Sequence, residues 1–164
     1  AMLDAPLLDK AAHLLSEFRE RGKMIATAES CTGGLIAGYL TEIAGSSDVV
    51  DRGFVTYSNQ AKSEMLGVDP ALIEAHGAVS AEVARAMADG ALSRSGAQVT
   101  VAVTGVAGPG ASEAKPAGLV WFGCAANGHQ TLVDKCQFDG DRNAVRRQTV
   151  DHAFDMALRM AAGN

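Results

Sequence analysis

Cysteine, aromatic side chains and positive charge are all scarce in this sequence of 164 residues. Its three cysteines, Cys31, Cys124 and Cys136, show no CxxC or cysteine–histidine spacing, which argues against a disulfide framework or a metal site. A net charge of −5 provides no basic surface for nucleic acid or a membrane, so we expect neither as a partner. No apolar run approaches the roughly 20 residues of a membrane span, and no signal peptide is recognised. We therefore expect a cytoplasmic protein.

The residues that are abundant indicate a folded α/β domain. Hydrophobic residues form 48% of the chain although aromatic residues form only 5%, and 18 glycines accompany them, a balance typical of strands rich in valine and alanine. Neither a linker nor a repeat interrupts the sequence. We expect a single domain over residues 1–164, large enough to bury roughly two thirds of the surface of the unfolded chain.

Helical and strand-like patterns alternate along the chain. Apolar residues at helical spacing, with capping residues before them, predict helices at 6–22, 32–45, 59–67, 81–96 and 142–160, and Asp69–Pro70 predicts one further helix start. Short apolar or β-branched runs predict strands at 24–29, 49–58, 98–105, 119–126 and 131–138.

This alternation predicts a three-layer α/β/α sandwich around a mixed, mostly parallel sheet with one antiparallel strand. The antiparallel strand follows from Asn127–Gly128, a hairpin signal between two strand patterns. Ligands of such sheets bind where strands end and helices begin. Three loops have that placement, at 30–34, 57–62 and 105–110, and they would form one site if the strand order brings them together.

Ser30 and Cys31 stand side by side in ATAESCTGG, residues 26–34, at a predicted strand-to-helix turn. Ser30 could be a nucleophile beside backbone amides that stabilise an oxyanion. The residues alone favour a simpler interpretation, in which Ser30 or Thr32 caps the helix. Cys31 is intrinsically the better nucleophile, but no histidine stands in a partner motif, so a small buried side chain is favoured for it.

A base for Ser30 is offered by TYSNQAK, in which Tyr57 and Lys62 flank a strand end and a helix start. To act as a base near neutral pH, Lys62 needs a pKa lowered from about 10.4 to near 7, which burial supplies. A solvated Lys62 and a packed Tyr57 are the alternative.

The glycine-rich segment TGVAGPG, residues 104–110, follows a strand, and its small residues allow the backbone to approach an anion closely. Gly105 and Gly110 have the spacing of a Walker A loop, but Ala111 stands where that loop requires lysine, so nucleoside triphosphate binding is not expected. A merely tight loop is the alternative.

Two further patterns involve charged residues. Arg142 and Arg146 share one face at a helix start, where they could bind a phosphate group. The alternative is that both arginines are exposed to solvent and bind nothing. Ser112 and Lys115 match the SxxK pattern of penicillin-recognising enzymes. Because proline and glycine bracket that pattern, we interpret it as a mobile loop rather than a helix.

Five motifs in order resemble the CinA C-terminal domain family over about residues 7–160. They are TAESCTGGLIA, GFVTYSNQAKSEMLGV, AVTGVAGPG, KPAGLVWFG and GDRNAVRRQTV. The resemblance implies an amidohydrolase of pyridine-nucleotide recycling that converts nicotinamide mononucleotide to nicotinate mononucleotide and ammonia, without a cofactor or metal. It also favours a homodimer. One departure is ASEAKPAG after GPG, where the family commonly has further glycine and a threonine.

The resemblance also implies roles for single residues. Ser30 is similar to the family's nucleophile, Lys62 to its base and Tyr57 to an assisting hydroxyl. The expected substrate and oxyanion residues are Cys31, Thr32, Gly33, Gly34, Thr104, Gly105, Gly108, Gly110, Arg142 and Arg146. Two alternatives stay open: a catalytically silent nucleotide-binding regulatory module of the same fold, and an amidase that uses Cys31.

Overall fold

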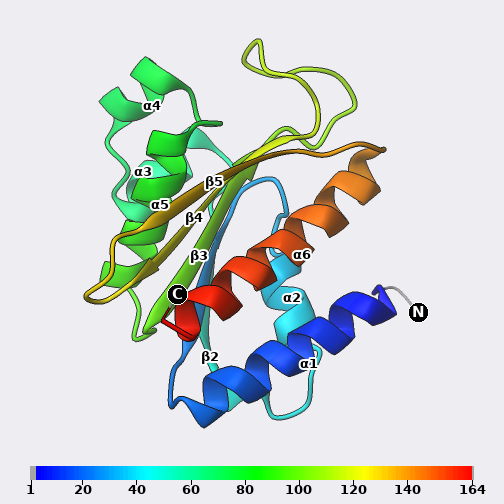
Figure 1. Ribbon diagram of the computed structural model, residues 1–164. Helices are drawn as coiled ribbons and strands as arrows, with labels where there is room; N and C mark the ends of the chain where they lie inside the picture. The colour runs from blue at the N-terminus through cyan, green and yellow to red at the C-terminus, as the bar shows by residue number, and fades with distance from the viewer. Residues whose placement is uncertain (1–2, 164) are drawn as a thin grey trace.

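The computed structural model describes residues 3–163, and its centre is a five-stranded sheet with helices on both faces (Figure 1). The strand order is β2-β1-β3-β4-β5; β1 pairs in parallel with β2 and β3, whereas β4 is antiparallel to β3 and β5. Only β4 therefore runs against the other strands, which confirms the predicted mixed sheet. The strands are β1 Ile25–Glu29, β2 Val50–Val55, β3 Val99–Gly105, β4 Leu119–Ala126 and β5 Leu132–Gln137.

Two helical layers cover this sheet. One apolar cluster joins α1, α2 and α6 to one face, and a second joins α3, α4 and α5 to the other. In Figure 1 the red and orange α6 crosses the sheet on the side of α1 and α2, and the green helices lie behind. The helices are α1 Ala5–Glu20, α2 Leu35–Thr41, α3 Asn59–Leu66, α4 Pro70–His76, α5 Ala81–Ser93 and α6 Arg142–Ala161, with a 3₁₀ turn, η1, at Ser46–Asp48.

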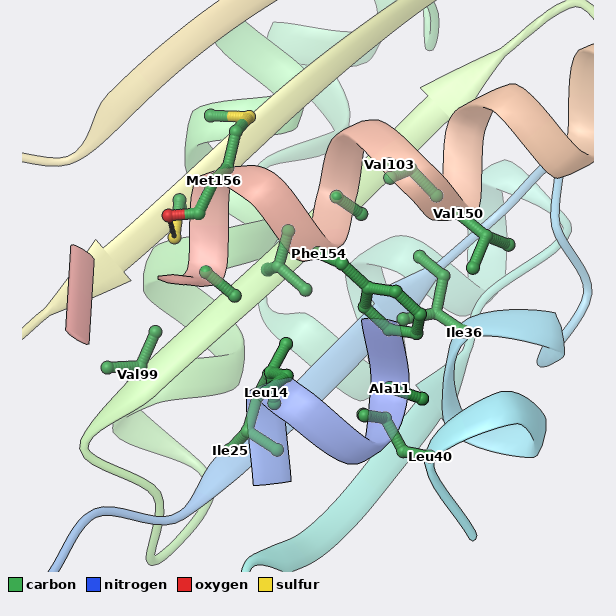
Figure 2. Packing of buried hydrophobic residues seen from close by; sticks show 14 of the residues in the cluster. Ala11, Leu14, Ile25, Ile36, Leu40, Val99, Val103, Val150, Phe154 and Met156 are labelled. Carbon is green, nitrogen blue, oxygen red and sulfur yellow. Dashed lines mark hydrogen bonds between the residues drawn. The ribbon is translucent and has the colours of Figure 1, made fainter. Parts of the chain in front are cut away.

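The central strands are buried on both faces because each lies between the two helical layers. Every residue of β1 is buried, and side chains of β3 alternate between the clusters: Val101 and Val103 face α6, and Ala102 faces α5. Figure 2 shows Val103 and Phe154 of α6 among the side chains of the first cluster. This packing holds the carboxyl ends of β1 and β3 at the same edge of the sheet.

Most of the predicted helix starts are confirmed. Ser58, Asp69, Ser80 and Asp141 each cap a helix by accepting a hydrogen bond from a backbone amide. None of the helices within residues 3–163 has the length and apolar character needed to cross a membrane.

One helix start differs from the prediction. α2 begins at Leu35, after a turn at residues 30–34, and its N-cap is Gly34 with φ of 105°. Neither Ser30 nor Thr32 caps it, so the capping interpretation of these residues is wrong. The Ser30 side chain is instead available for another contact.

Candidate active site

Ser30 and Lys62 form a buried pair where β1 and β2 end. The Nζ atom of Lys62 donates a hydrogen bond to Ser30 Oγ at 3.0 Å. Lys62 is only 1% exposed and Ser30 8% exposed, so the interpretation of Lys62 as a solvated surface residue is wrong. The strand order therefore brings the loops at 30–34 and 57–62 together.

Burial, rather than its hydrogen bonds, disfavours the charged form of Lys62. Its Nζ also donates to the backbone oxygens of Thr56 at 3.0 Å and Tyr57 at 3.4 Å, and no carboxylate within residues 3–163 forms a salt bridge with it. Desolvation by burial lowers the pKa of the Lys62 amine. A lysine with a lowered pKa, in contact with a serine hydroxyl, is suited to take the proton of that hydroxyl.

The backbone of Ser30 is held between two strands. Its amide donates to Val103 O of β3 at 3.1 Å, and Thr56 N donates to Glu29 O at 2.8 Å and so extends the pairing of β1 with β2. Because Ser30 is the first residue after β1, its position follows from the parallel register of three strands. The hydroxyl lies on a rigid part of the fold.

Glu29, the last residue of β1, accepts the hydrogen bonds at the start of α2 that a serine or threonine hydroxyl was expected to accept. Its carboxylate is fully buried and accepts from Ile36 N at 2.9 Å and Ala37 N at 3.0 Å, in the first turn of α2. It also accepts from the hydroxyls of Thr32 at 2.5 Å and Thr27 at 3.2 Å. An anion is favoured at a helix N-terminus. Glu29 was not predicted as a functional residue, although a lone acidic residue that ends an apolar strand is a usable signal.

The turn between Ser30 and α2 contains backbone amides without an acceptor in the described part of the chain. Gly33 N donates to Ser30 O at 3.0 Å, and Gly33 and Gly34 have φ of 60° and 105°, in the region that glycine readily adopts. The amides of Cys31 and Thr32 donate to no acceptor within the described chain, residues 3–163. Such amides next to a nucleophile can stabilise an oxyanion.

The thiol of Cys31 is unsuited to nucleophilic attack. Cys31 is 5% exposed, and burial raises its pKa to about 12. The thiol therefore stays protonated near neutral pH, whereas a thiolate is the nucleophilic form. The prediction that Cys31 is a small buried side chain is confirmed.

A cavity of about 190 Å³ opens above the Ser30–Lys62 pair. It gathers residues from the loops at 30–34, 57–62 and 105–110, together with the later part of the β3–β4 loop and the segment before α5. The chemically relevant lining residues are Ser30, Cys31, Tyr57, Asn59, Lys62, Thr104, Gly105, Ser112, Glu113 and Arg142.

A second cavity of about 230 Å³ adjoins the first and is lined by the glycine-rich loop, including Gly108 and Gly110. Tyr57 and Arg142 line both cavities. Arg142 donates to Gly108 O at 2.6 Å and to the Tyr57 hydroxyl at 3.1 Å. Tyr57 is 62% exposed, so the interpretation of a packed tyrosine is wrong. The two cavities together suit an elongated ligand with an anionic end near Arg142.

Arg146 lies apart from both cavities. Its Nη2 donates to Thr32 O at 2.9 Å, and it lines a different cavity of about 470 Å³ that contains neither Ser30 nor Lys62. Arg146 therefore supports the turn after Ser30, whereas Arg142 reaches the lining of the Ser30 cavity. The sequence placed both arginines on one face, and the fold separates their surroundings.

The SxxK segment forms a tight turn, which confirms that it is not a helix. Ser112 and Lys115 pair through backbone hydrogen bonds of 3.0 and 2.8 Å. Glu113, between them, lines the Ser30 cavity. Sequence analysis did not single out Glu113, because its place depends on how this loop folds over the sheet edge.

No group of three or more histidine, cysteine, aspartate or glutamate side chains within residues 3–163 has a geometry that could hold a metal ion. The chemistry that the described residues offer is that of a serine nucleophile, a lysine base and backbone oxyanion donors. A phosphate-sized anion could bind at the glycine-rich loop and Arg142.

Comparison with known proteins extends over the same residues. A model of the CinA C-terminal domain family matches residues 8–161. Nicotinamide-nucleotide amidohydrolase PncC of Enterobacter agglomerans is 48% identical over 159 residues, which cover 96% of this chain and 97% of that relative. A putative competence-damage inducible protein of Symbiobacterium thermophilum is 50% identical over 153 residues, which cover 88% of this chain but 36% of that longer relative.

A solved structure shows the same fold. The crystal structure of competence/damage inducible protein CihA from Agrobacterium tumefaciens superposes with a TM-score of 0.92 at 48% identity. The match covers 97% of this chain and 99% of that one. The likeness thus includes the strands and loops that build the Ser30 cavity.

Proposed function

Because this chain belongs to the CinA C-terminal domain family, we propose that it is a nicotinamide-nucleotide amidohydrolase, which converts nicotinamide mononucleotide to nicotinate mononucleotide and ammonia. The name of the Enterobacter agglomerans relative, which matches over nearly its full length, supports this activity. The structural observation that carries the proposal is the buried hydrogen bond between Lys62 Nζ and Ser30 Oγ.

In the proposed first half of the reaction, Ser30 Oγ attacks the carboxamide carbon and Lys62 takes the hydroxyl proton. In the uncharged amine the two N–H groups can donate to Thr56 O and Tyr57 O, and the contact with Ser30 then reverses, with the Ser30 hydroxyl donating to the lone pair of Nζ. The amide of Cys31, which lines the cavity, donates to the oxyanion that forms. The carbon–nitrogen bond then breaks and leaves an ester on Ser30.

Ammonia needs a proton to leave. We assign Tyr57 as the relay that passes the proton from Lys62 to the departing nitrogen. The Tyr57 oxygen accepts a hydrogen bond from Arg142, and its own O–H is thus left to donate to another group. In the second half, water attacks the ester, Lys62 takes a proton from that water, and Ser30 regains its own proton as the acid product forms.

The nucleotide part of the substrate suits the adjoining cavity. Arg142 provides a charged donor at the junction of the two cavities, and Gly108 and Gly110 leave the loop backbone open to a phosphate. Positioning the phosphate there would place the carboxamide toward Ser30.

The direct test uses the purified chain with nicotinamide mononucleotide. We expect ammonia and nicotinate mononucleotide to appear in equal amounts, as measured by an ammonia assay and by chromatography of the products. Calorimetry measures the binding of nicotinamide mononucleotide to the same protein. Binding without ammonia release would contradict the proposal and support the silent regulatory module; failure to bind would contradict both functions.

A Cys31→Ser substitution separates the serine mechanism from a cysteine mechanism. We expect kcat for ammonia release to stay within about tenfold of the unmodified protein, because only the backbone amide of Cys31 takes part and its thiol is protonated. Steady-state assays measure this. Near-complete loss in Cys31→Ser, with Ser30→Ala still active, would show that Cys31 is the nucleophile.

A further inference from the structure

Glu113 is an acidic residue in the proposed reaction cavity for which the mechanism above has no role. It belongs to the loop between β3 and β4, drawn in yellow-green at the top of Figure 1. Its side chain lines the same cavity as Ser30 and Lys62. Glu113 is an exposed residue whose position in the lining lets it face a ligand bound in this cavity.

The loop is tied to the segment before α5, which fixes the place of Glu113. The two carboxylate oxygens accept from Ala78 N and Val79 N, each at 3.4 Å. Lys115 donates from Nζ to His76 O at 3.0 Å and also to Val79 O. The turn backbone has φ of 53° at Glu113, a conformation rare for this residue type. These contacts hold the carboxylate at the cavity, where long hydrogen bonds leave it accepting capacity.

The charges near Ser30 are unevenly distributed. Burial lowers the pKa of Lys62, and this weakens the positive charge beside the nucleophile. Arg142 stands at the junction with the adjoining cavity and contacts Gly108 and Tyr57. The negative charge of Glu113 is close enough to Lys62 to oppose the lowering of its pKa. Among the described residues that line this cavity, Glu113 is the one acidic residue.

We propose that Glu113 is a specificity-determining residue that selects a carboxamide over a carboxylate beside Ser30. This inference rests on the proposed function. A carboxamide offers two N–H donors to an acidic acceptor, whereas the carboxylate of the product has only acceptors and carries the same charge as Glu113. Glu113 thus binds the NH₂ group of the substrate and repels the acid product, which speeds product release.

The test compares binding of the amide and the acid without turnover. Each ligand, nicotinamide mononucleotide or nicotinate mononucleotide, is titrated by calorimetry into Ser30→Ala, Ser30→Ala/Glu113→Gln and Ser30→Ala/Glu20→Gln. Glutamine keeps an acceptor for the amide, adds a donor for the acid and removes the like charge. Glu20→Gln removes the same charge from the exposed end of α1 and serves as the matched control.

We expect the ratio of the dissociation constant of the acid to that of the amide to fall about tenfold with Glu113→Gln and to stay unchanged with Glu20→Gln. The reason is that a charge in the cavity lining disfavours a ligand group of the same charge. An unchanged preference in the Glu113→Gln variant would overturn the inference. If the unmodified protein also releases ammonia, only the role of Glu113 fails. If neither ligand binds any variant, or no ammonia is released, the proposed function itself fails.

Discussion

Replacement of Ser30 by alanine is expected to lower kcat for ammonia release by at least about 10³-fold, the scale seen when the nucleophile of a serine hydrolase is removed. The reason is that no other described group takes its place: the neighbouring Cys31 is buried, and burial raises its pKa to about 12. Ammonia release under saturating nicotinamide mononucleotide measures the effect.

Two controls accompany the Ser30→Ala variant. Ser47→Ala changes an exposed serine outside the cavity and should leave ammonia release unaltered. Thermal unfolding should show that Ser30→Ala is folded, since Lys62 Nζ keeps its contacts with Thr56 O and Tyr57 O. Full activity of Ser30→Ala would refute the serine mechanism.

Replacement of Lys62 by methionine is expected to lower kcat by a similar factor of at least about 10³, because the proton of Ser30 then has no base. Lys135→Met, at an exposed position on β5, is the matched control and should retain activity. In the unmodified protein, activity should fall as pH falls through the lowered pKa of Lys62, since the protonated amine cannot act as a base. A Lys62→Met variant with normal activity would exclude Lys62 as the base.

The same substitution should change how stability depends on pH. The pKa of Lys62 lies below 10.5 in the folded protein, so the unfolded chain binds more protons between that lowered pKa and 10.5. The free energy of unfolding of the unmodified protein therefore decreases as pH falls through this window and stays lowered below it. The Lys62→Met variant lacks this pH-dependent decrease in the free energy of unfolding.

Denaturant unfolding at several pH values measures the difference. The free energy of unfolding of Lys62→Met minus that of the unmodified protein should increase as pH falls from 10.5 through the window and then remain constant. A difference that does not change with pH would contradict a lowered pKa for Lys62. Lys135→Met reports any general effect of removing a lysine.

The prediction of elements from the sequence succeeded where the signal is local. The apolar run before Ser30 predicts β1, the apolar spacing around Leu14 predicts α1, and Asn127–Gly128 predicts the β4–β5 hairpin; all three are confirmed. Such patterns depend on which side chains neighbouring residues must bury or expose, and the sequence contains that information directly. The three-layer sandwich follows from the order of these elements.

The start of α2 shows where local rules fail. A serine or threonine before an apolar stripe usually caps a helix. Here the buried carboxylate of Glu29 accepts from two amides of the first turn, so the helix begins at Leu35. A charged acceptor in a buried place forms the stronger hydrogen bond, and its burial depends on strands that are distant in the sequence.

The sequence alone determined the fold class, most of the elements and the residues Ser30 and Lys62 as candidates for one site. Tertiary structure decided that they touch, that Arg142 rather than Arg146 lines their cavity, and that Glu113 enters it. Helical and strand periodicity depends on residues that are only a few positions apart in the sequence. The meeting of these side chains is set by the order β2-β1-β3 and by a loop from β3 to β4 that folds over the sheet edge, and neither leaves a periodic trace in the chain.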